Sequence, residues 1–445
     1  MKKEDEILEK EIKSFVEDFM KKLDNQEAYI ISHFDTDGIT SASIMVHTLK
    51  KLDKRFSVKI IKSLDEKFIS ELPKEKLILF LDLASGSLHH IEKANLNNVF
   101  IIDHHEITHK VPENVRIINP HLINKQKISG SGLTYLFCKQ INPEIKELSK
   151  LAILGMIGDC LEKDIDSLNN GILEESEVQR KRGLLIYPST RPINRVLEYS
   201  SNPYIPEVTG NIKGVLELLR EAGLTPEKGK YKSIMELNEK EMKDLTTAIL
   251  LRNPKIKNKD LVGDIFLIKM FNKIEDARDL SAIINACSRS GKPELAIQYC
   301  LEIPSSKKNV ELTHIKYKQN IISGLNFVTE TEKIEGKGFV IINAQDNIKD
   351  TMIGTIASII SNSSIYEEGT IIITMAYYED KIKISARTVG KRGRNLRGLL
   401  EIITNSTGGE IGGHEHAAGC IINQEKEKEF VDLLKKNLEI ELIKI

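Results

Sequence analysis

Aspartate and histidine side chains recur in four separated segments of the chain, each at the end of an apolar run or within a helical pattern. The first segment, "ISHFDTDGITSASIM", carries a histidine and two aspartates on every second residue. Alternate side chains of an extended strand point the same way, so these three are expected to face one crevice. The other segments are "FLDLASG", "FIIDHHE" and "LGMIGDC". Together the four segments contribute His33, Asp35, Asp37, Asp82, Asp103, His104, His105 and Asp159.

These residue types favour a site for divalent cations. A single aspartate after a strand is most often a turn former or a helix cap. Asp82 and Asp159, however, end apolar runs, where an unpaired carboxylate is costly and a metal ion offsets that cost. Imidazoles and carboxylates without a thiolate suit Mn²⁺ or Mg²⁺ better than structural zinc. A carboxylate shared by two ions about 3.5 to 4 Å apart forms a clamp for in-line phosphoryl displacement. The ligands therefore predict a metal-dependent phosphoesterase.

The elements around these segments predict how they are brought together. Short β-rich runs alternate with helical runs from residue 28 to about residue 160, which is typical of βαβ units on a parallel sheet. In such sheets, ligands bind in the crevice beyond the carboxyl ends of the strands. The expected strands are residues 28–33, 56–61, 76–83, 98–105 and 115–119, and the expected helices are residues 38–52, 131–141 and 144–160.

The remainder of the chain predicts further helices and a second sheet. Residues 1–27 carry apolar side chains at helical spacing, and residues 161–304 read as mostly helical with one strand at 264–270. Later strands are expected at 337–344, 368–378 and 380–388, and helices at 395–406 and 425–438. The predicted fold class is therefore α/β: an N-terminal helix (1–27), a parallel-sheet domain (28–304) with a helical insertion (about 195–304), a long connecting helix (305–330) and a smaller C-terminal α/β domain (331–445).

The composition indicates a globular protein of several domains. Its 445 residues are too many for one ordinary core. A net charge of -1 gives no global basic field, so any nucleic-acid contact must come from local patches. The five cysteines form no CxxC pair, which predicts buried free thiols and a cytoplasmic location. Neither a signal-peptide pattern nor an apolar run of bilayer length occurs, so no membrane role is expected.

The motifs "HFDTDG", "LDLASG", "DHH" and "GMIGD" resemble, in this order, the four motifs of the DHH phosphoesterase superfamily. That superfamily is built on a bridged pair of Mn²⁺ or Mg²⁺ ions. The resemblance implies that Asp103 orients an imidazole and that His105 faces the substrate phosphate, so both are expected catalytic residues. It also implies six metal ligands: His33 and Asp35 on one ion, Asp37, His104 and Asp159 on the other, and Asp82 as the bridge.

In the C-terminal half, "GGEIGGHEHAAGC" resembles the GGHxxAAG signature of the DHHA1 domain, which grips the substrate of these enzymes. Taken alone, the stretch is equally a glycine-rich turn before a helix of small residues. As a DHHA1 signature, Gly412 and Gly413 let backbone amides approach a phosphate, and His414 can donate to it.

Residues 381–400 hold seven basic residues and no acidic one. A run of charge is often only a solvated face. Arg387, however, lies in "ISART", where RecJ-like members of the superfamily carry an arginine that grips phosphate, and a guanidinium suits bidentate phosphate contact. The expected substrate-binding residues of this segment are Ser385, Arg387, Lys391, Arg392, Arg394 and Arg397.

Three further stretches, "TRPINRVLEYSSNPYIPEVTG", "ARDLSAIINACSRSGKPELAIQYCL" and the connecting helix, resemble archaeal RecJ-like nucleases. The similarity runs from about residue 28 to the end of the chain. It implies an exonuclease that hydrolyses terminal phosphodiesters of single-stranded DNA, with RNA as a second candidate substrate, to nucleoside monophosphates during archaeal DNA replication or repair. Some such relatives bind the GINS complex and another branch associates with a repair helicase, so both are candidate partners.

Two alternative functions remain open. One is a nanoRNase or dinucleotide phosphodiesterase, with which the near-neutral charge is compatible. The basic segment 381–400 and the helical insertion favour a polymeric substrate instead. The other is an inactive scaffold subunit of a replication complex. A scaffold would have no reason to retain all six ligands, which favours an active enzyme.

Overall fold

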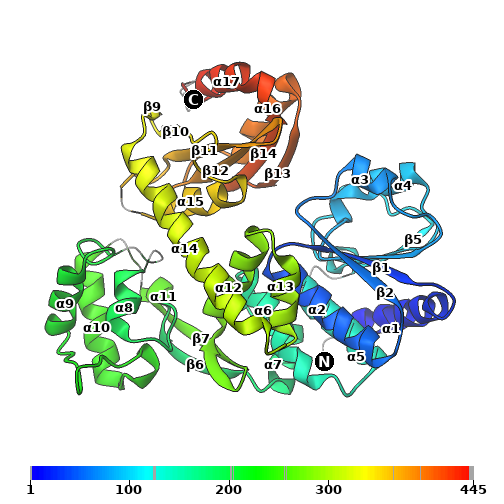
Figure 1. Ribbon diagram of the computed structural model, residues 1–445, viewed down its shortest axis with the longest axis horizontal. Helices are drawn as coiled ribbons and strands as arrows, with labels where there is room; N and C mark the ends of the chain where they lie inside the picture. Colours follow the sequence, from blue (N-terminus) through cyan, green and yellow to red (C-terminus); the bar gives the residue numbers. More distant parts are fainter. Residues whose placement is uncertain are drawn as a thin grey trace. The chain divides into compact units, whose positions relative to one another are not determined.

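The structure, a computed structural model, describes residues 3–123, 127–200, 203, 205–254, 256, 258–363, 365–390 and 392–439. The chain divides into two compact units, Met1–Thr190 with Gly263–His314, and Arg191–Val262 with Ile315–Ile445. Figure 1 shows the elements of both units. None of the helices in the described ranges combines the length and the apolar character that crossing a bilayer requires.

A five-stranded parallel sheet forms the centre of the first unit, in the spatial order β2-β1-β3-β4-β5. All five strands predicted from the sequence are present. The predicted strand 76–83 runs past the observed end because Asp82 adopts a left-handed backbone conformation, with φ of 58°, and so leaves the sheet. The observed strands are β1 (Ala28–His33), β2 (Phe56–Ile61), β3 (Leu77–Leu81), β4 (Val99–Ile102) and β5 (Val115–Ile118).

Helices cover both faces of this sheet, and alternation along the strands decides which residue meets which layer. In β3, Leu79 belongs to the core beneath one group of helices, whereas Phe80 belongs to the core on the opposite face. The first group is α1 (Lys3–Leu23), α2 (Thr36–Lys51), α5 (Gly130–Ile141) and α6 (Ser149–Gly158). The opposite face is covered by α3 (Glu66–Ser70) and α4 (Leu88–Ala94).

The N-terminal helix predicted from apolar spacing is present and packs on the body of the unit. Phe15 and Phe19 of α1 each make edge-to-face ring contacts with Phe100 of β4 and Phe137 of α5, at centroid distances of 5.1 to 5.6 Å. Such geometry adds about 0.5–1.5 kcal/mol per aromatic pair beyond area burial. The helix is therefore an integral part of the core.

A three-stranded sheet, β6-β7-β8, lies beyond α6 in the chain, where only one strand was predicted. The predicted strand corresponds to β7. The sequence missed β6 because "QRKRGL" has no apolar alternation, and four of its six residues are exposed. The strands are β6 (Gln179–Leu184), β7 (Val262–Met270) and β8 (Lys273–Asp276), and the helices of this part are α7 (Ser167–Glu175), α12 (Ala277–Arg289) and α13 (Pro293–Cys300).

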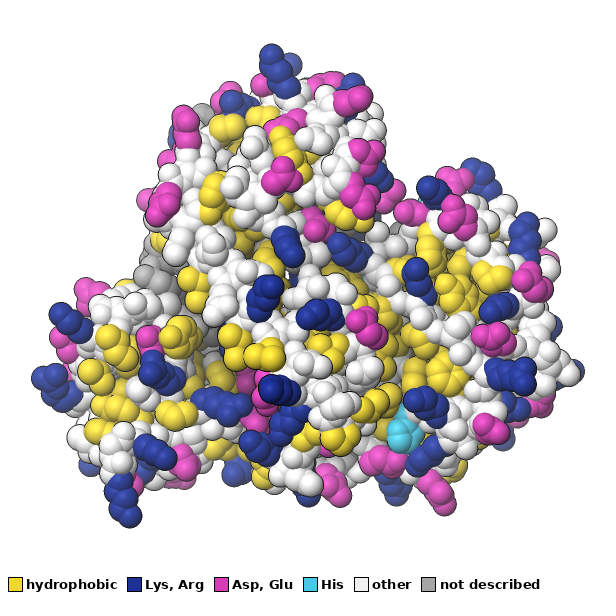
Figure 2. Space-filling model, in the orientation of Figure 1, with side chains coloured by type: hydrophobic (Ala, Val, Ile, Leu, Met, Phe, Trp, Pro, Cys, Tyr) yellow, Lys and Arg dark blue, Asp and Glu magenta, His cyan; other side chains and the backbone are white. Residues whose placement is uncertain are grey.

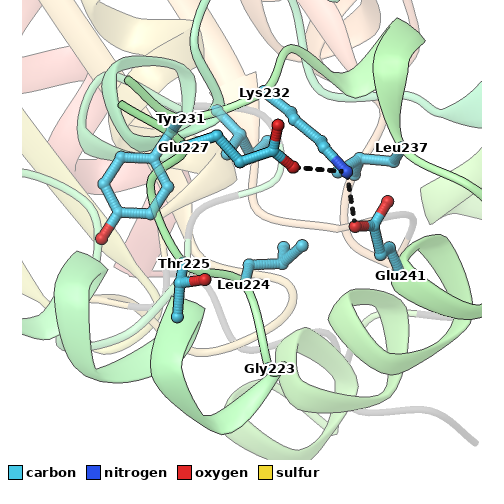
Figure 3. A pocket seen from close by; sticks show the side chains of 9 residues that line it. Gly223, Leu224, Thr225, Glu227, Tyr231, Lys232, Leu237 and Glu241 are labelled. Carbon is cyan, nitrogen blue, oxygen red and sulfur yellow. Dashed lines mark hydrogen bonds and ion pairs between the residues drawn. The ribbon is translucent and has the colours of Figure 1, made fainter. Parts of the chain in front are cut away.

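The segment between β6 and β7, which is part of the predicted insertion (about 195–304), is helical, with α8 (Ile193–Glu198), α9 (Ile212–Glu221), α10 (Glu239–Arg252) and α11 (Asn258–Leu261). The rest of that predicted range, from Gly263, belongs to the first unit. A small hollow within it contains Lys232, whose Nζ lies 3.1 Å from Glu227 Oε1 and 2.9 Å from Glu241 Oε1 (Figure 3). The charge of this lysine is thus balanced within the insertion. The predicted connecting helix is also present, as α14 (Ser306–Glu330).

The C-terminal part of the second unit is built on a six-stranded sheet in the order β13-β14-β12-β11-β10-β9. Only the β10–β11 pair is parallel among its described pairs. The elements are β9 (Ile334–Gly336), β10 (Phe339–Asn343), α15 (Asp350–Asn362), β11 (Ile371–Tyr378), β12 (Lys381–Thr388), α16 (Leu396–Thr407), β13 (Glu410–His414), β14 (Ala417–Asn423) and α17 (Glu427–Glu439). The predicted α/β class, with a parallel sheet followed by a smaller α/β domain, is confirmed.

The glycine-rich stretch 408–420 forms a hairpin, β13–β14, so the alternative of a turn before a small-residue helix is wrong. Gly413 has φ of 110°, a conformation that favours glycine over other residues. On β14, a Cβ added at Gly419 would meet the carbonyl oxygen of Ile384 at 2.8 Å. The small residues therefore serve close approach between strands rather than helix packing.

Candidate metal centre

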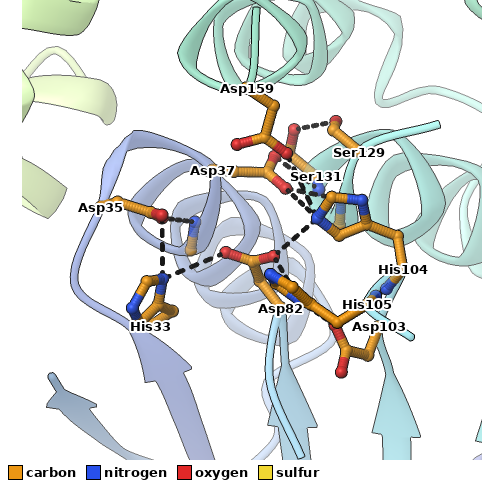
Figure 4. A network of polar contacts seen from close by, with 12 residues as sticks. His33, Asp35, Asp37, Asp82, Asp103, His104, His105, Ser129, Ser131 and Asp159 are labelled. Atoms are coloured by element: carbon orange, nitrogen blue, oxygen red, sulfur yellow. Dashed lines mark hydrogen bonds and ion pairs between the residues drawn. The ribbon is translucent and has the colours of Figure 1, made fainter. Parts of the chain in front are cut away.

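The four polar segments meet at the carboxyl edge of the parallel sheet (Figure 4). His33 is the last residue of β1, Asp82 follows β3, and Asp103 follows β4, and these strands are neighbours in the sheet. Asp37 lies in the first turn of α2, and Asp159 caps the C-terminus of α6. The topology thus gathers residues that are up to 126 positions apart in the sequence.

Two groups of ligand-type atoms form at this edge, one around His33 and one around His104, and Asp82 pairs with both histidines. In the first, His33 Nδ1 lies 2.9 Å from Asp35 Oδ2 and 3.7 Å from Asp82 Oδ2. In the second, His104 Nε2 lies 3.3 Å from Asp82 Oδ1 and 3.2 Å from Asp159 Oδ2. Asp37 Oδ2 completes the second group at 3.7 Å from the same Nε2. The structure brings together all six residues that the sequence nominated as ligands.

The carboxylate of Asp82 carries the strongest indication that a cation belongs here. Its side chain is 1% exposed, and neither oxygen has a hydrogen-bond partner. Burial, and then the neighbouring charges of Asp37 and Asp35, raise the pKa of Asp82 well above its usual range. Burial and the charges of Asp37 and Asp82 do the same to the pKa of Asp159. A divalent cation would satisfy these oxygens, so the residues fit such an ion.

Asp37 is held by backbone amides that sequence reasoning missed. The amide of Gly130 donates to Asp37 Oδ2 at 2.6 Å, and the amide of Ser131 donates to Oδ1 at 3.0 Å. A Cβ added at Gly130 would lie 2.8 Å from Asp82 Cβ, and one at Gly155 would collide with Asp37 Oδ1. The signal in the sequence was "SGSG" at residues 129–132, which combines a helix N-cap with two close-approach glycines.

The alternation of positions 33, 35 and 37 has a different cause from the predicted one. These residues do not share an extended strand, because β1 ends at His33 and α2 begins at Thr36. Asp35 is the N-cap of α2, with its Oδ1 accepting from the Gly38 amide at 3.0 Å. The same carboxylate raises the pKa of His33 against the opposing effect of burial. The three ligands converge through a strand end, a cap and a first helical turn.

Asp103 and His105 form a pair beside these ligands. The Nδ1 of His105 also lies 3.9 Å from Asp82 Oδ1, and a third group of ligand-type atoms consists of Asp82, His104 and His105. Asp103 is fully buried, and its Oδ1 lies 2.7 Å from His105 Nδ1 while its Oδ2 accepts from the Ser85 amide at 2.9 Å. Burial opposes ionisation of Asp103, but the hydrogen bond and charge of His105 hold its pKa well below the usual range. The His105 side chain is 51% exposed. Asp103 therefore anchors an imidazole that is accessible to a ligand.

Within the second unit, the predicted substrate residues gather on one face of the C-terminal sheet. In the strand register, Arg387 of β12 and His414 of β13 both oppose Ala417 of β14. Residues directly opposite one another point to the same face, so these side chains flank a small residue. The next row along the strands has the same character and consists of Ser385, Gly419 and Gly412.

This face is only partly covered by α15. Arg387 Nε donates to Ser358 Oγ of α15 at 3.0 Å, and its Nη1 donates to the carbonyl of Ala386 at 2.8 Å. The opposite face of the same strands packs on α16 and α17 through an apolar core that includes Ile384 and Cys420. The two rows, Ser385, Gly419 and Gly412 in one and Arg387, Ala417 and His414 in the other, therefore form a surface with few side-chain atoms. We call this surface the floor of the C-terminal sheet.

The remaining basic residues of the segment 381–400 have different surroundings. Arg394 Nη1 donates to the carbonyl of Asn437 in α17, and Arg397 Nη1 donates to the carbonyl of Gly413 at 3.3 Å. Arg392 is exposed and 4.0 Å from Glu368 Oε1. Lys391 lies outside the described residues. Of the predicted basic track, Arg397 is thus in contact with the glycine-rich hairpin.

Three family models match the chain in sequence order. The DHH family, N-terminal domain, matches residues 27–158, the DHH-CID domain matches residues 186–259, and the DHHA1 domain matches residues 336–439. The first match contains five of the six proposed ligands and ends one residue before Asp159. The last contains the β12–β14 face described above.

Two related proteins match the chain in sequence. An uncharacterized protein of Methanocaldococcus jannaschii is 31% identical over 444 residues, covering 95% of this chain and 96% of its own length. The single-stranded-DNA-specific exonuclease RecJ of Bacillus subtilis is 27% identical over 151 residues, which is 31% of this chain and 19% of that protein.

Solved structures share the fold. RecJ from Thermus thermophilus in complex with Mn²⁺ matches 97% of this chain and 55% of its own, with 16% identity and a TM-score of 0.61. This chain therefore spans about half of that structure. CDC45 from Entamoeba histolytica matches 96% of this chain and 99% of its own, with 12% identity and a TM-score of 0.66. The chain belongs to the DHH/DHHA1 superfamily and is a RecJ-like member of it.

Proposed function

We propose that the protein is a divalent-metal-dependent phosphodiesterase that trims single-stranded nucleic acid from one end and releases nucleoside monophosphates. The observation that carries this proposal is the buried carboxylate of Asp82, which has no hydrogen-bond partner and is shared by two groups of ligand-type atoms. A shared carboxylate between two ions is the arrangement that hydrolyses phosphodiesters by in-line attack. The superfamily to which the chain belongs supports phosphoesterase chemistry.

The proposed ligands of one ion are His33, Asp35 and Asp82. Those of the second ion are Asp82, Asp37, His104 and Asp159. When bound, Mn²⁺ or Mg²⁺ would lower the pKa of a water molecule and stabilise the charge that develops on the phosphate oxygens. The Mn²⁺ complex of the Thermus RecJ, which shares the fold, supports the choice of metal.

Residues of each unit would supply orientation and charge toward phosphate groups of the substrate. The bond from His105 Nδ1 to Asp103 fixes the imidazole and leaves Nε2 as the ring atom available to a phosphate oxygen. On the C-terminal domain, Arg387 and His414 would hold the terminal or scissile phosphate, and the amides of Gly412 and Gly413 can approach it without hindrance from side chains. Ser385 and Arg397 would add contacts to the same phosphate backbone.

The proposed substrate is a polymer rather than a free nucleotide. On the face drawn in Figure 2, basic and acidic side chains are interspersed, so an extended strand would depend on local groups such as those of segment 381–400. The Bacillus relative is named for its specificity for single-stranded DNA. We further propose a role in replication or repair, with the GINS complex or a repair helicase as candidate partners and residues 331–445 as the substrate-binding domain.

The scaffold alternative has one supporting observation, the shared fold with CDC45. Against it stands the ligand set: all six proposed ligands are present, and each belongs to a group of three residues whose ligand atoms lie within 4.8 Å of one another. A scaffold would gain nothing from keeping the buried Asp82 and the partly buried Asp159 with raised pKa values. Activity is therefore the better proposal.

The test is digestion of strands of about 20 nucleotides labelled at either end, as DNA and as RNA, in Mn²⁺ and in Mg²⁺, with a dinucleotide as a second substrate. The proposed function predicts labelled mononucleotide from one end and shortening products from the other. Cleavage of the dinucleotide with no cleavage of the longer strands would identify the small-substrate alternative. No cleavage of any substrate by metal-loaded protein would favour the scaffold.

A further inference from the structure

Asn119 follows β5 and is fully buried next to the proposed active site. No motif of the metal centre includes it. Its side-chain amide makes three hydrogen bonds: Nδ2 donates to Ser85 Oγ at 2.8 Å and to the carbonyl of His105 at 2.9 Å, and Oδ1 accepts from the amide of His121 at 2.9 Å. Both amide hydrogens and the carbonyl are therefore used.

These contacts connect the loops that follow three neighbouring strands, β3, β4 and β5. Ser85 is in the loop after β3, and its backbone amide holds Asp103 Oδ2. His105 is in the loop after β4, and its ring is held by Asp103 Oδ1. Asp103 is thus held by Ser85 and in turn holds the His105 imidazole. Asn119 contacts both Ser85 and His105.

The chemistry requires an asparagine. The carbonyl of His105 can only accept, so the atom facing it must be a donor. Aspartate has the same shape, but it would place an acceptor oxygen against that carbonyl. The buried carbonyl of His105 would then have no donor in this position, which is energetically unfavourable. The loop at His105, whose side chain is 51% exposed, would therefore shift.

We propose that Asn119 is a positioning residue for the reaction: it fixes the backbone at His105 and thereby the direction of the imidazole toward the substrate phosphate. This inference rests on the proposed function, since it assigns His105 to substrate. It distinguishes His105 from the ligand His104, whose Nε2 contacts Asp37, Asp82 and Asp159 rather than any group bound to Asn119.

The experiment compares wild type with N119A, N119D, H105A and the double variant N119A/H105A. Loss of a group that orients a functional residue typically costs about 10–100-fold in activity, so kcat of N119A and N119D is expected to fall by that factor with KM within about 2-fold. In the H105A background, N119A is expected to change kcat by less than about 2-fold, because the two residues act as one unit. Losses that multiply would overturn the inference.

The matched control is N114A. Asn114 is in the segment that leads into β5, and its Nδ2 also donates to a backbone carbonyl, that of Leu96, but away from the site. Its kcat is expected to equal that of wild type. Mn²⁺ affinity, measured by calorimetry, is expected to stay within about 3-fold in N119A, because an orienting partner of His105 is not a partner of the ligands. A wild-type kcat in N119D would also overturn the proposal.

A readout independent of cleavage is the side-chain spectrum of ¹⁵N-histidine-labelled protein, with the His105 signals assigned from H105A. The Nδ1 proton bound to Asp103 is expected in wild type and N114A and is expected to weaken or disappear in N119A and N119D. If the wild type cleaves nothing, the proposed function fails and this spectrum still decides whether Asn119 orients His105. An unchanged spectrum in both Asn119 variants sinks the inference.

Discussion

The two sheets of the protein present opposite kinds of polar surface. At the parallel sheet, buried carboxylates crowd together, and both oxygens of Asp82 lack a hydrogen-bond partner. On the C-terminal sheet, Gly412, Ala417 and Gly419 leave a floor almost free of side chains, flanked by Arg387 and His414. The first surface suits a cation, whereas the second leaves room for a bulky anion. In the proposed function, the chemistry and the binding of substrate would thus be built by opposite means, by excess charge and by missing side chains.

The largest expected effect comes from removing the carboxylate of Asp82, which both ligand groups share. D82A is expected to lower cleavage by about 10³-fold or more, since removing one preorganised electrostatic group already costs about 10²–10³-fold. The fold should survive, because no donor depends on the Asp82 oxygens. Cleavage rate and Mn²⁺ binding by calorimetry measure the outcome.

The control for D82A is D65A, which removes an aspartate that only caps α3, through a bond of 2.7 Å from the Phe68 amide to Asp65 Oδ1. It should cost about 1 kcal/mol of stability and leave cleavage intact. D37A is harder to interpret than D82A, because it also removes the hydrogen-bond acceptor of the Gly130 and Ser131 amides. Wild-type cleavage by D82A would contradict the metal-centre assignment.

The second prediction concerns the open floor of the other sheet. R387A is expected to lower kcat/KM by about 10²-fold, mainly by raising KM, and R387K should not restore it, because an ammonium cannot make the bidentate contact of a guanidinium. Substrate titrations on end-labelled DNA measure both constants. K381A, a basic residue on the same strand about 20 Å away, is the control. Equal effects of R387A and K381A would make Arg387 part of a diffuse basic surface.

The third prediction uses the crowding of carboxylates in the metal-free protein. Asp82 has a raised pKa, so the folded state binds its proton more tightly than the unfolded state does. Above the unfolded carboxyl pKa of about 3.9, ionisation therefore destabilises the fold, and stability decreases as pH rises toward the folded pKa. Metal-free D82N cannot ionise and is expected to be more stable than metal-free wild type at pH 7, by about 1–3 kcal/mol.

Saturating Mn²⁺ should reverse that order, because only the wild type retains the complete ligand set and gains binding free energy in the folded state. Chemical denaturation at pH 5 and pH 7, with and without Mn²⁺, measures both effects. A metal-free D82N protein less stable than wild type at pH 7 would show that the Asp82 charge is already balanced within the chain.

The sequence predicted the parallel sheet and all six proposed ligands because both leave local signals. An apolar run that ends in aspartate, as at Asp82, indicates both a buried strand and a polar site at the end of that strand. Contacts made by backbone atoms left much weaker signals: "SGSG" indicates a helix N-cap and close-approach glycines, but it does not indicate that the amides of Gly130 and Ser131 hold Asp37. Asn119, followed by a proline, looks like an ordinary turn residue. Its contacts depend on two loops distant in sequence.

Side-chain patterns also misled where the backbone decides the structure. The basic strand β6 lacks apolar alternation because most of it is exposed, so no periodicity marked it. The regular spacing of His33, Asp35 and Asp37 suggested one strand, but Asp35 caps a helix and ends the extended backbone. That these residues lie together was thus predictable, whereas the way each one is held required the fold.

The smallest expected effect concerns Arg392 of the C-terminal domain. It tests whether this arginine binds phosphate or is only a solvated charge. The Arg392 side chain is 86% exposed, so a single contact with the nucleic-acid backbone would be strongly screened by salt. R392A is expected to weaken binding of single-stranded DNA by no more than about 5-fold at low salt, and to make the slope of log affinity against log salt shallower by about 0.7, the value for one phosphate contact on a single strand. K428A on α17 is the matched exposed control and should leave the slope unchanged. An unchanged slope in R392A would limit the anion-binding surface to the glycine-rich floor, and the contrast between the two sheets would then rest on Arg387 and His414 alone.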